Sequence, residues 1–147
     1  MAIVTGSCRF GLWHVHVSWQ DDLVYRVRFA RDGIVGPVPE EILRYCAGRE
    51  TDLSALRSVA TEGGSTSAAI YRAVRSIPYG ETVTYGEVAR MVGTAPRAVG
   101  SAMARNPTPL VVPCHRVVAK TGIGGFSPDV TIKEALLTME RRESRRS

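Results

Sequence analysis

The chain has 147 residues, of which 44% are hydrophobic and 22% are charged, as is ordinary for one globular domain or two small ones. It has no apolar run long enough to cross a bilayer, no secretory-signal pattern at its start, and three cysteines too widely spaced for a disulfide framework. We therefore expect a reduced, cytoplasmic protein with no membrane partner. The net charge of +5 is compatible with nucleic acid, but indicates it only weakly.

The N-terminal third alternates between apolar and polar residues, which is the pattern of a β-hairpin with one buried face. Apolar side chains occupy every second position in residues 13–19 and again in residues 25–29, and Asp21-Asp22 predicts the turn between them. The segment EEILRYCAG then predicts a short helix that ends at Gly48.

A polar, glycine-rich segment, ATEGGSTS at residues 60–67, is the best candidate for a domain boundary. Beyond it the apolar spacing becomes that of helices, and the first of these ends at the Pro-Tyr-Gly of residues 78–80. We expect a small, sheet-bearing α/β domain over residues 1–62 and a helical domain over residues 66–147. The fold class is therefore α+β.

Two short helices joined by a tight glycine turn predict a helix-turn-helix in the second domain. In the first helix, TYGEVARMVG, Thr84 and Glu87 form a capping box. Its apolar face consists of Val88, Met91 and Val92. The second helix, RAVGSAMARN, follows the TAP segment and ends at an Asn-Pro pair.

One side of the second helix is flat, because it holds only small residues between two arginines: Arg97, Gly100, Ser101, Ala104 and Arg105. A typical major-groove reader carries long polar side chains that reach base edges. A face this small suits close approach to a shallow surface such as a minor groove. The alternative is a small-residue helix packed against a neighbour.

The last helix follows the segment GIGGFSPDV. Thr131 and Glu134 predict a second capping box, and Glu140 lies at the edge of the buried stripe, where its carboxylate can turn inward to a polar partner. The stripe consists of Ile132, Ala135, Leu136 and Met139.

The segment NPTPLVVPCHRVVAK places Cys114 and His115 in or beside an extended stretch rich in valine. Neighbouring strand side chains point to opposite faces, so either the backbone bends at Pro113 or a water carries the proton between the two side chains. A carboxylate would then orient the imidazole, and Glu140 is the best-placed candidate, with Glu134, Asp129 and others remaining open.

Two other interpretations of the cysteines remain open. Cys114 is alternatively a buried structural thiol, since free cysteine is among the most buried residue types. A zinc site built from Cys8, His14, His16 and Cys46 is conceivable, although these spacings match no familiar zinc finger.

Five segments in order, IPYGETVTYGEVA, RAVGSAMARNP, VPCHRVV, a GxGGF loop and KEALLTME, resemble the O6-alkylguanine–DNA alkyltransferases. The resemblance runs from about Thr66 to Glu143, and the N-terminal third resembles the family's ribonuclease H-like domain only loosely. It implies a monomeric direct-reversal repair protein that flips a nucleotide out of double-stranded DNA. The alkyl group of O6-alkylguanine, or of O4 of thymine, would move once onto the protein's own cysteine, with no cofactor and no metal.

The same resemblance implies roles for the residues around the cysteine. Cys114 would be the alkyl acceptor, His115 would act as the base through a water, and Glu140 would orient His115. Asn106 would support the active-site turn. The residues implied to bind the substrate are Tyr85, Met103, Val117, Phe126 and Ser127.

Among these, Tyr85 would help to rotate the nucleotide and contact the base, and Met103 would line the pocket. The Val117 carbonyl would receive the amino group of the base, and the Ser127 N–H would lie near O6. Phe126 stands where tyrosine is frequent in the family.

The flat face of the second helix would bind DNA through the minor groove, and Arg97 would fill the place that the flipped base leaves. Pro128-Asp129 departs from the family's usual glycine pair, and we expect narrower tolerance of bulky adducts. The alternatives are a helix-turn-helix transcription regulator, a cysteine hydrolase, and a non-catalytic lesion-binding relative. Cys114 argues against the last of these, because such proteins carry another residue at that position.

Overall fold

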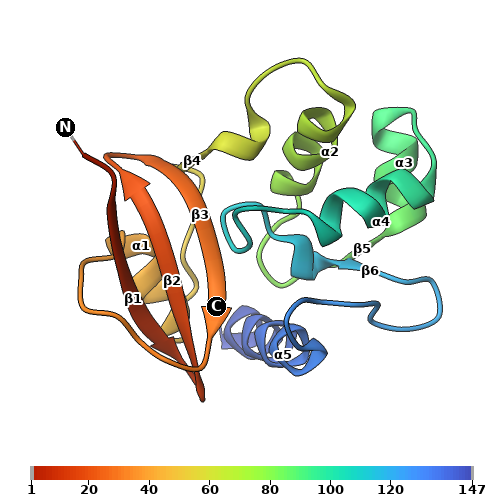
Figure 1. Ribbon diagram of the computed structural model, residues 1–147. Helices are drawn as coiled ribbons and strands as arrows, with labels where there is room; N and C mark the ends of the chain where they lie inside the picture. The colour runs from red at the N-terminus through yellow and green to blue at the C-terminus, as the bar shows by residue number, and fades with distance from the viewer. Residues whose placement is uncertain (1, 147) are drawn as a thin grey trace.

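A mixed four-stranded sheet forms one side of the molecule and most of the helices form the other, as the computed structural model of residues 2–146 shows (Figure 1). The strand order is β1-β2-β3-β4, with β4 parallel to β3 and the other pairs antiparallel. The strands are β1 (Val4–Phe10), β2 (Trp13–Gln20), β3 (Leu23–Ala30) and β4 (Arg57–Ser58). The α+β class is confirmed.

The predicted hairpin is formed by β2 and β3, and Asp21 in its turn has a φ of 55°. Val15, Val17 and Val27 are buried, as the alternation predicts, whereas Trp13 and Trp19 at the ends of the stripe are only partly buried. The sequence pattern missed β1, because its inward-facing positions include a glycine and a cysteine rather than a run of large apolar residues.

Helix α1 (Glu40–Cys46) ends as predicted, with Gly48 at a φ of 89°. The chain then passes through β4 and the short helix η1 (Val59–Thr61) into α2 (Thr66–Arg75), which Ser65 caps.

The predicted pair of helices is present as α3 (Tyr85–Val92) and α4 (Pro96–Ala104). The capping box of Thr84 and Glu87 is confirmed, and Gly93 closes α3 with a φ of 84°. The prediction that Met91 faces the core is wrong: its side chain is 56% exposed, and Val88 and Ala89 are the buried residues of α3. The reason is that α3 lies at the edge of the apolar cluster formed with α2 and α4, where only part of its apolar face is covered.

Helix α5 (Val130–Arg146) begins differently from the prediction. The Asp129 carboxylate accepts hydrogen bonds from the backbone N–H of Thr131 at 2.9 Å and from its hydroxyl at 2.8 Å, so Asp129 caps this helix, in place of the predicted box of Thr131 and Glu134. Ala135 is exposed, not buried, and Leu137 is buried in its place.

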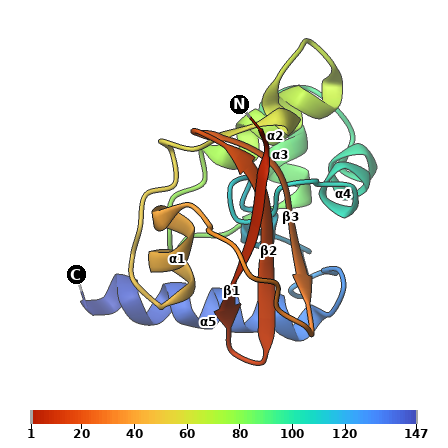
Figure 2. The same cartoon turned by 60° about the vertical axis from the view of Figure 1, so that its left-hand side comes forward.

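Two apolar clusters hold the molecule together. The first joins the inner face of the sheet and α1 to residues from far along the chain, Leu110, Val111, Ile132 and Leu136. The second lies among α2, α3 and α4. Figure 2 shows α5 running across the lower part of the sheet beside α1. Within residues 2–146, none of the helices is long and apolar enough to cross a membrane.

A short parallel pair, β5 (Val83–Thr84) and β6 (Val117–Val118), positions the site. Strand β5 leads directly into α3, and β6 directly follows the turn η2 (Cys114–Arg116). The cysteine-bearing turn is therefore bonded to the start of the two-helix unit.

Candidate active site

Cys114 and His115 lie in a 3₁₀ turn, so the backbone does bend at Pro113. His115 Nδ1 has no hydrogen-bond partner among the described residues, so the bend leaves the route through a water open. Pro113 has a φ of −77° and a ψ of 68°, which takes the chain out of the extended conformation. The turn is supported by Asn106, whose side-chain N–H donates to the Val112 carbonyl at 2.9 Å.

The wall of a cavity of about 320 Å³ includes Cys114, which is 7% exposed. The cavity lies between α4, the start of α3 and the loop that precedes α5. Its lining consists of Tyr85, Gly100, Met103, Ala104, Asn106, Pro109, Cys114, Gly125, Phe126 and Ser127. Because Cys114 lines a cavity, its low exposure does not by itself make it a structural thiol.

Behind the cysteine, Glu140 is the centre of a fully buried polar cluster. His115 Nε2 donates to Glu140 Oε2 at 2.5 Å. Arg116 Nε donates to Glu140 Oε1 at 2.9 Å, and Arg116 Nη2 donates to Glu140 Oε2 at 3.0 Å. The Gly80 backbone N–H donates to Glu140 Oε1 at 3.0 Å. The Tyr45 hydroxyl also donates to Oε2. The carboxylate is therefore paired and has a donor on every side, as a buried charge requires.

This cluster leaves His115 as a base. Burial lowers the pKa of His115 and outweighs the opposing effect of Glu140, so the ring is neutral near pH 7. With the hydrogen on Nε2 facing the carboxylate, Nδ1 is the ring nitrogen that accepts a proton. That atom is buried and has no hydrogen-bond partner among the described residues.

The cysteine itself rests as a thiol. Burial raises the pKa of Cys114, while the Asn106 side chain and the Lys133 charge act in the opposite direction. Burial also raises the pKa of Tyr85, so its hydroxyl remains protonated and able to donate. A thiol beside a neutral imidazole can pass its proton to that imidazole when an electrophile arrives.

Three side chains of the site were missed by sequence reasoning. Tyr45 lies 70 positions before His115 in the chain, and no local pattern connects them. Arg116 directly follows the histidine, but arginine is mostly exposed in proteins, so its residue type gave no signal of a buried position. Lys133 is fully buried and donates to the carbonyls of Val117 at 2.7 Å and Gly125 at 3.3 Å. Its spacing of seven residues from Glu140 was the available signal, since both lie on the inward stripe of α5.

Val117 does not line the cavity; it is fully buried and its carbonyl already accepts a hydrogen bond from Lys133. Of the predicted DNA-binding residues, Arg97, Ser101 and Ala104 are exposed on α4, Gly100 is partly exposed there, and Arg105 is exposed just after the helix ends. The Asp129 carboxylate, part of the departure from the family's usual glycine pair, is engaged in capping α5.

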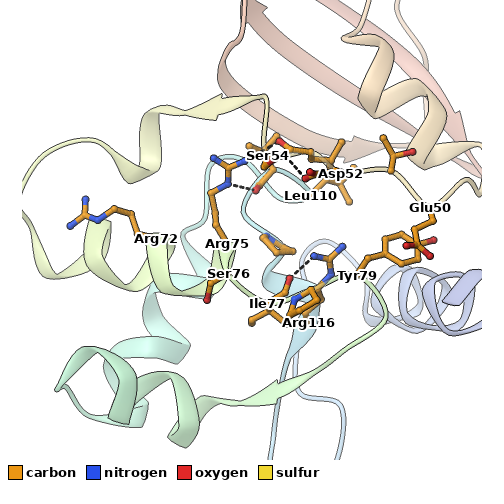
Figure 3. A pocket seen from close by; sticks show the side chains of 15 residues that line it. Glu50, Asp52, Ser54, Arg72, Arg75, Ser76, Ile77, Tyr79, Leu110 and Arg116 are labelled. Atoms are coloured by element: carbon orange, nitrogen blue, oxygen red, sulfur yellow. Dashed lines mark hydrogen bonds between the residues drawn. The ribbon is translucent and has the colours of Figure 1, made fainter.

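A second cavity, of about 520 Å³, lies on the other side of the turn (Figure 3). There Arg75 donates to the carbonyls of Val111 and Leu53, both at 3.0 Å, and Arg116 donates to the Ile77 carbonyl at 2.8 Å. These two guanidinium groups therefore link the turn and the segment before it to α2 and to the chain before and after that helix.

The residues of the conceivable zinc site have other partners. Cys8 and Cys46 are free thiols that share a hydrogen bond, and His16 Nε2 lies 2.6 Å from the Asp32 carbonyl. In residues 2–146 no group of three or more His, Cys, Asp or Glu side chains is arranged to hold a metal ion.

A cysteine on the wall of a cavity, with a buried His–Glu pair behind it and a two-helix unit beside it, is the arrangement that a cysteine-dependent transferase or hydrolase would need. The family model described as 6-O-methylguanine DNA methyltransferase, DNA binding domain, matches residues 65–142. This is more than half of the chain, so the protein belongs to that family, and the resemblance noted in its sequence is confirmed.

Curated relatives and solved structures agree with this assignment. The chain is 44% identical over 96 residues to a methylated-DNA–protein-cysteine methyltransferase of Metallosphaera sedula, an alignment that covers 65% of this chain and 61% of the relative. It is 50% identical over 72 residues to one of Methanocaldococcus vulcanius, covering 49% and 45%. The matches thus span about half to three-fifths of the relatives' length.

The structural similarity extends over nearly the whole chain. The O6-methylguanine methyltransferase of Mycobacterium tuberculosis aligns with a TM-score of 0.78 at 26% identity, covering 97% of this chain and 94% of that one. The O6-methylguanine-DNA methyltransferase of Pyrococcus kodakaraensis aligns with a TM-score of 0.73 at 31% identity, covering 92% and 97%. The M. tuberculosis protein has also been solved in complex with DNA, and that chain aligns with a TM-score of 0.77 at 28% identity, covering 93% and 92%.

Proposed function

We propose that the protein is a methylated-DNA–[protein]-cysteine S-methyltransferase, which moves an alkyl group from O6 of guanine, or O4 of thymine, in DNA onto Cys114. The observation that carries this proposal is the position of Cys114 on the wall of the cavity beneath α4, with the buried pair of His115 and Glu140 behind it. Membership in the family supports the same chemistry.

The proton and the alkyl group move in opposite directions. His115 Nδ1 takes the thiol proton through a water, and the Cys114 sulfur attacks the alkyl carbon. The carbon–sulfur bond forms as the bond from carbon to O6 breaks, and the electron pair stays on guanine. The Tyr85 hydroxyl and the Ser127 N–H stabilise that leaving group. Because a thioether cannot be hydrolysed back, each chain reacts once.

DNA reaches this site through the flat face of α4. The alkylated atom lies inside the duplex, so the nucleotide is flipped into the cavity at a cost of a few kcal/mol. We expect the small residues of α4 to approach the minor groove and the side chain of Arg97 to fill the vacated place in the stack. A single copy of the chain carries all of these groups. The DNA complex of the M. tuberculosis relative supports DNA as the partner.

The test is to incubate the protein with a duplex that contains O6-methylguanine and to weigh it. We expect a gain of one methylene per chain, located on the peptide that holds Cys114, and no further gain with excess duplex. Cys114→Ser should gain nothing. An unchanged mass would favour the lesion binder or the helix-turn-helix regulator, and repeated turnover would favour the cysteine hydrolase.

The stack-filling role of Arg97 has a separate test. Arg97→Ala should slow transfer from duplex roughly tenfold, because an inserted side chain offsets part of the flipping cost. Transfer from free O6-benzylguanine should stay within about twofold of wild type, since Arg97 does not line the cavity. Equal slowing with both substrates would remove this role.

A further inference from the structure

Tyr45 is a group of the N-terminal half that lies inside the reaction centre. Its side chain is fully buried, and its hydroxyl donates to Glu140 Oε2 and lies 3.1 Å from His115 Nε2. Helix α1, which carries Tyr45, ends at Cys46, and 67 residues lie between it and the cysteine-bearing turn that begins at Cys114.

Resting on the proposed function, we propose that Tyr45 is a positioning residue for alkyl transfer: its hydroxyl holds the Glu140 carboxylate so that His115 stays an unprotonated base. A histidine against a lone buried carboxylate would be expected to take up a proton and form an ion pair. Each additional donor to that carboxylate makes it a weaker partner for the imidazolium. Tyr45 supplies such a donor at the same oxygen, Oε2, that faces His115.

The groups around His115 favour this role for Tyr45. Glu140 and Lys133 face it from α5, Arg116 from the turn η2, and Tyr45 from α1, with Cys114 next in the chain. Of these, only the Glu140 charge favours protonation of the imidazole, while the charges of Arg116 and Lys133 oppose it. Burial and the Glu140 charge raise the pKa of Tyr45 well above its ordinary value, so the hydroxyl keeps its proton and remains a donor.

The structure provides a matched control one ring away. Tyr79 packs edge-on against Tyr45, with ring centroids 5.9 Å apart, and its hydroxyl is buried without a hydrogen-bond partner among the described residues. Tyr45→Phe and Tyr79→Phe therefore each delete one buried hydroxyl from the same aromatic pair. Only the first deletion removes a bond to Glu140.

The experiment measures single-turnover transfer from O6-methylguanine duplex between about pH 5 and 9 for wild type and both variants. Tyr45→Phe should move the acidic limb of the rate profile to higher pH, because Glu140 then favours the imidazolium. The rate should fall about tenfold at the acid end and recover as pH rises. Duplex affinity should be unchanged, and Tyr79→Phe should follow wild type.

A graded substitution separates this role from simple packing. Replacing Tyr45 by 3-fluorotyrosine keeps the ring and the hydrogen bond but makes the phenol a stronger donor, so the acidic limb should move to lower pH. An unshifted limb in both Tyr45 variants would overturn the inference, even if the rates were uniformly lower. Failure of wild type to transfer the methyl group would instead overturn the proposed function.

Discussion

At the scale of single residues, the site is organised by charges that have left water. Lys133 is fully buried and holds the carbonyls of Val117 and Gly125 together, so its ammonium ties β6 to the loop that lines the cavity. Burial lowers the pKa of Lys133 from 10.5 to about 8, and the nearby Cys114 acts in the opposite direction. Keeping the Lys133 ammonium charged in this buried position therefore reduces the unfolding free energy.

That cost predicts how stability depends on pH. Because the pKa of Lys133 is lower in the folded protein than in the unfolded chain, the folded state releases its proton first as pH rises above about 8. The penalty for the buried charge is complete below this pH and is relieved toward pH 10.5. Lys133→Met should flatten the rise of unfolding free energy by up to about 1.4 kcal/mol per pH unit, the limit for one proton. Urea unfolding between pH 7.5 and 9.5 measures the difference; equal slopes would contradict it.

Residue-level prediction from the sequence succeeded where a local pattern carried the information. The PCHRV segment and the helical stripe that leads to Glu140 were enough to bring Cys114, His115 and Glu140 together. Tyr45 and Arg116 could not be predicted in the same way. Their places in the cluster depend on how α1 and the turn pack against α5, and hydrogen bonds of that kind have no signature in sequence spacing.

At the scale of elements, α4 carries the proposed DNA contact on a face with little relief. Ser101 is exposed at the middle of this face, between Arg97 and Arg105, and does not line the cavity. A change at Ser101 can therefore alter the approach to a duplex without altering the pocket.

Ser101→Glu should weaken duplex binding roughly tenfold to hundredfold, because a carboxylate on this face would oppose the phosphates. Transfer from the free base should be unaffected, and Ser101→Ala, which keeps the face small and neutral, should bind like wild type. Fluorescence anisotropy at two salt concentrations provides the measurement. Duplex affinity equal to wild type in the glutamate variant would place the DNA elsewhere.

Element boundaries show where sequence reasoning about the fold reached its limit. The hairpin and the two-helix unit follow from alternation, capping and glycine, and the structure has them. Of the valines around Cys114, Val117 and Val118 form the strand that their residue type favours, and Cys114 lies beside it. At Cys114 itself, Pro113 and the hydrogen bond from Asn106 turn the chain. The cap of α5 was placed two residues late because Thr131 and Asp129 both have cap chemistry, and only tertiary packing decides between them.

At the scale of the whole molecule, the apolar cluster beneath the sheet contains residues from both halves of the chain. The cluster beneath the sheet includes Leu110, Val111, Ile132 and Leu136 from the C-terminal half. A backbone hydrogen bond of 2.8 Å from Val27 to the Pro107 carbonyl also joins the halves. The division at residues 60–67 stays a prediction about chain organisation, and the shared core bears on how the halves unfold.

A core that draws on both halves should make unfolding a single cooperative transition. The two tryptophans, Trp13 and Trp19, both lie in β2, so their fluorescence reports on the sheet alone. Far-UV circular dichroism is dominated by the helices, most of which lie in the other half. We expect the two signals to give the same urea midpoint. Leu136→Ala should lower the unfolding free energy by about 2–5 kcal/mol, since Leu136 is fully buried in the shared cluster. Both urea midpoints should therefore fall together. If the dichroism midpoint moved while the fluorescence midpoint stayed, the sheet would not depend on α5 for its stability, and Tyr45 would be held near Glu140 by something other than the common core.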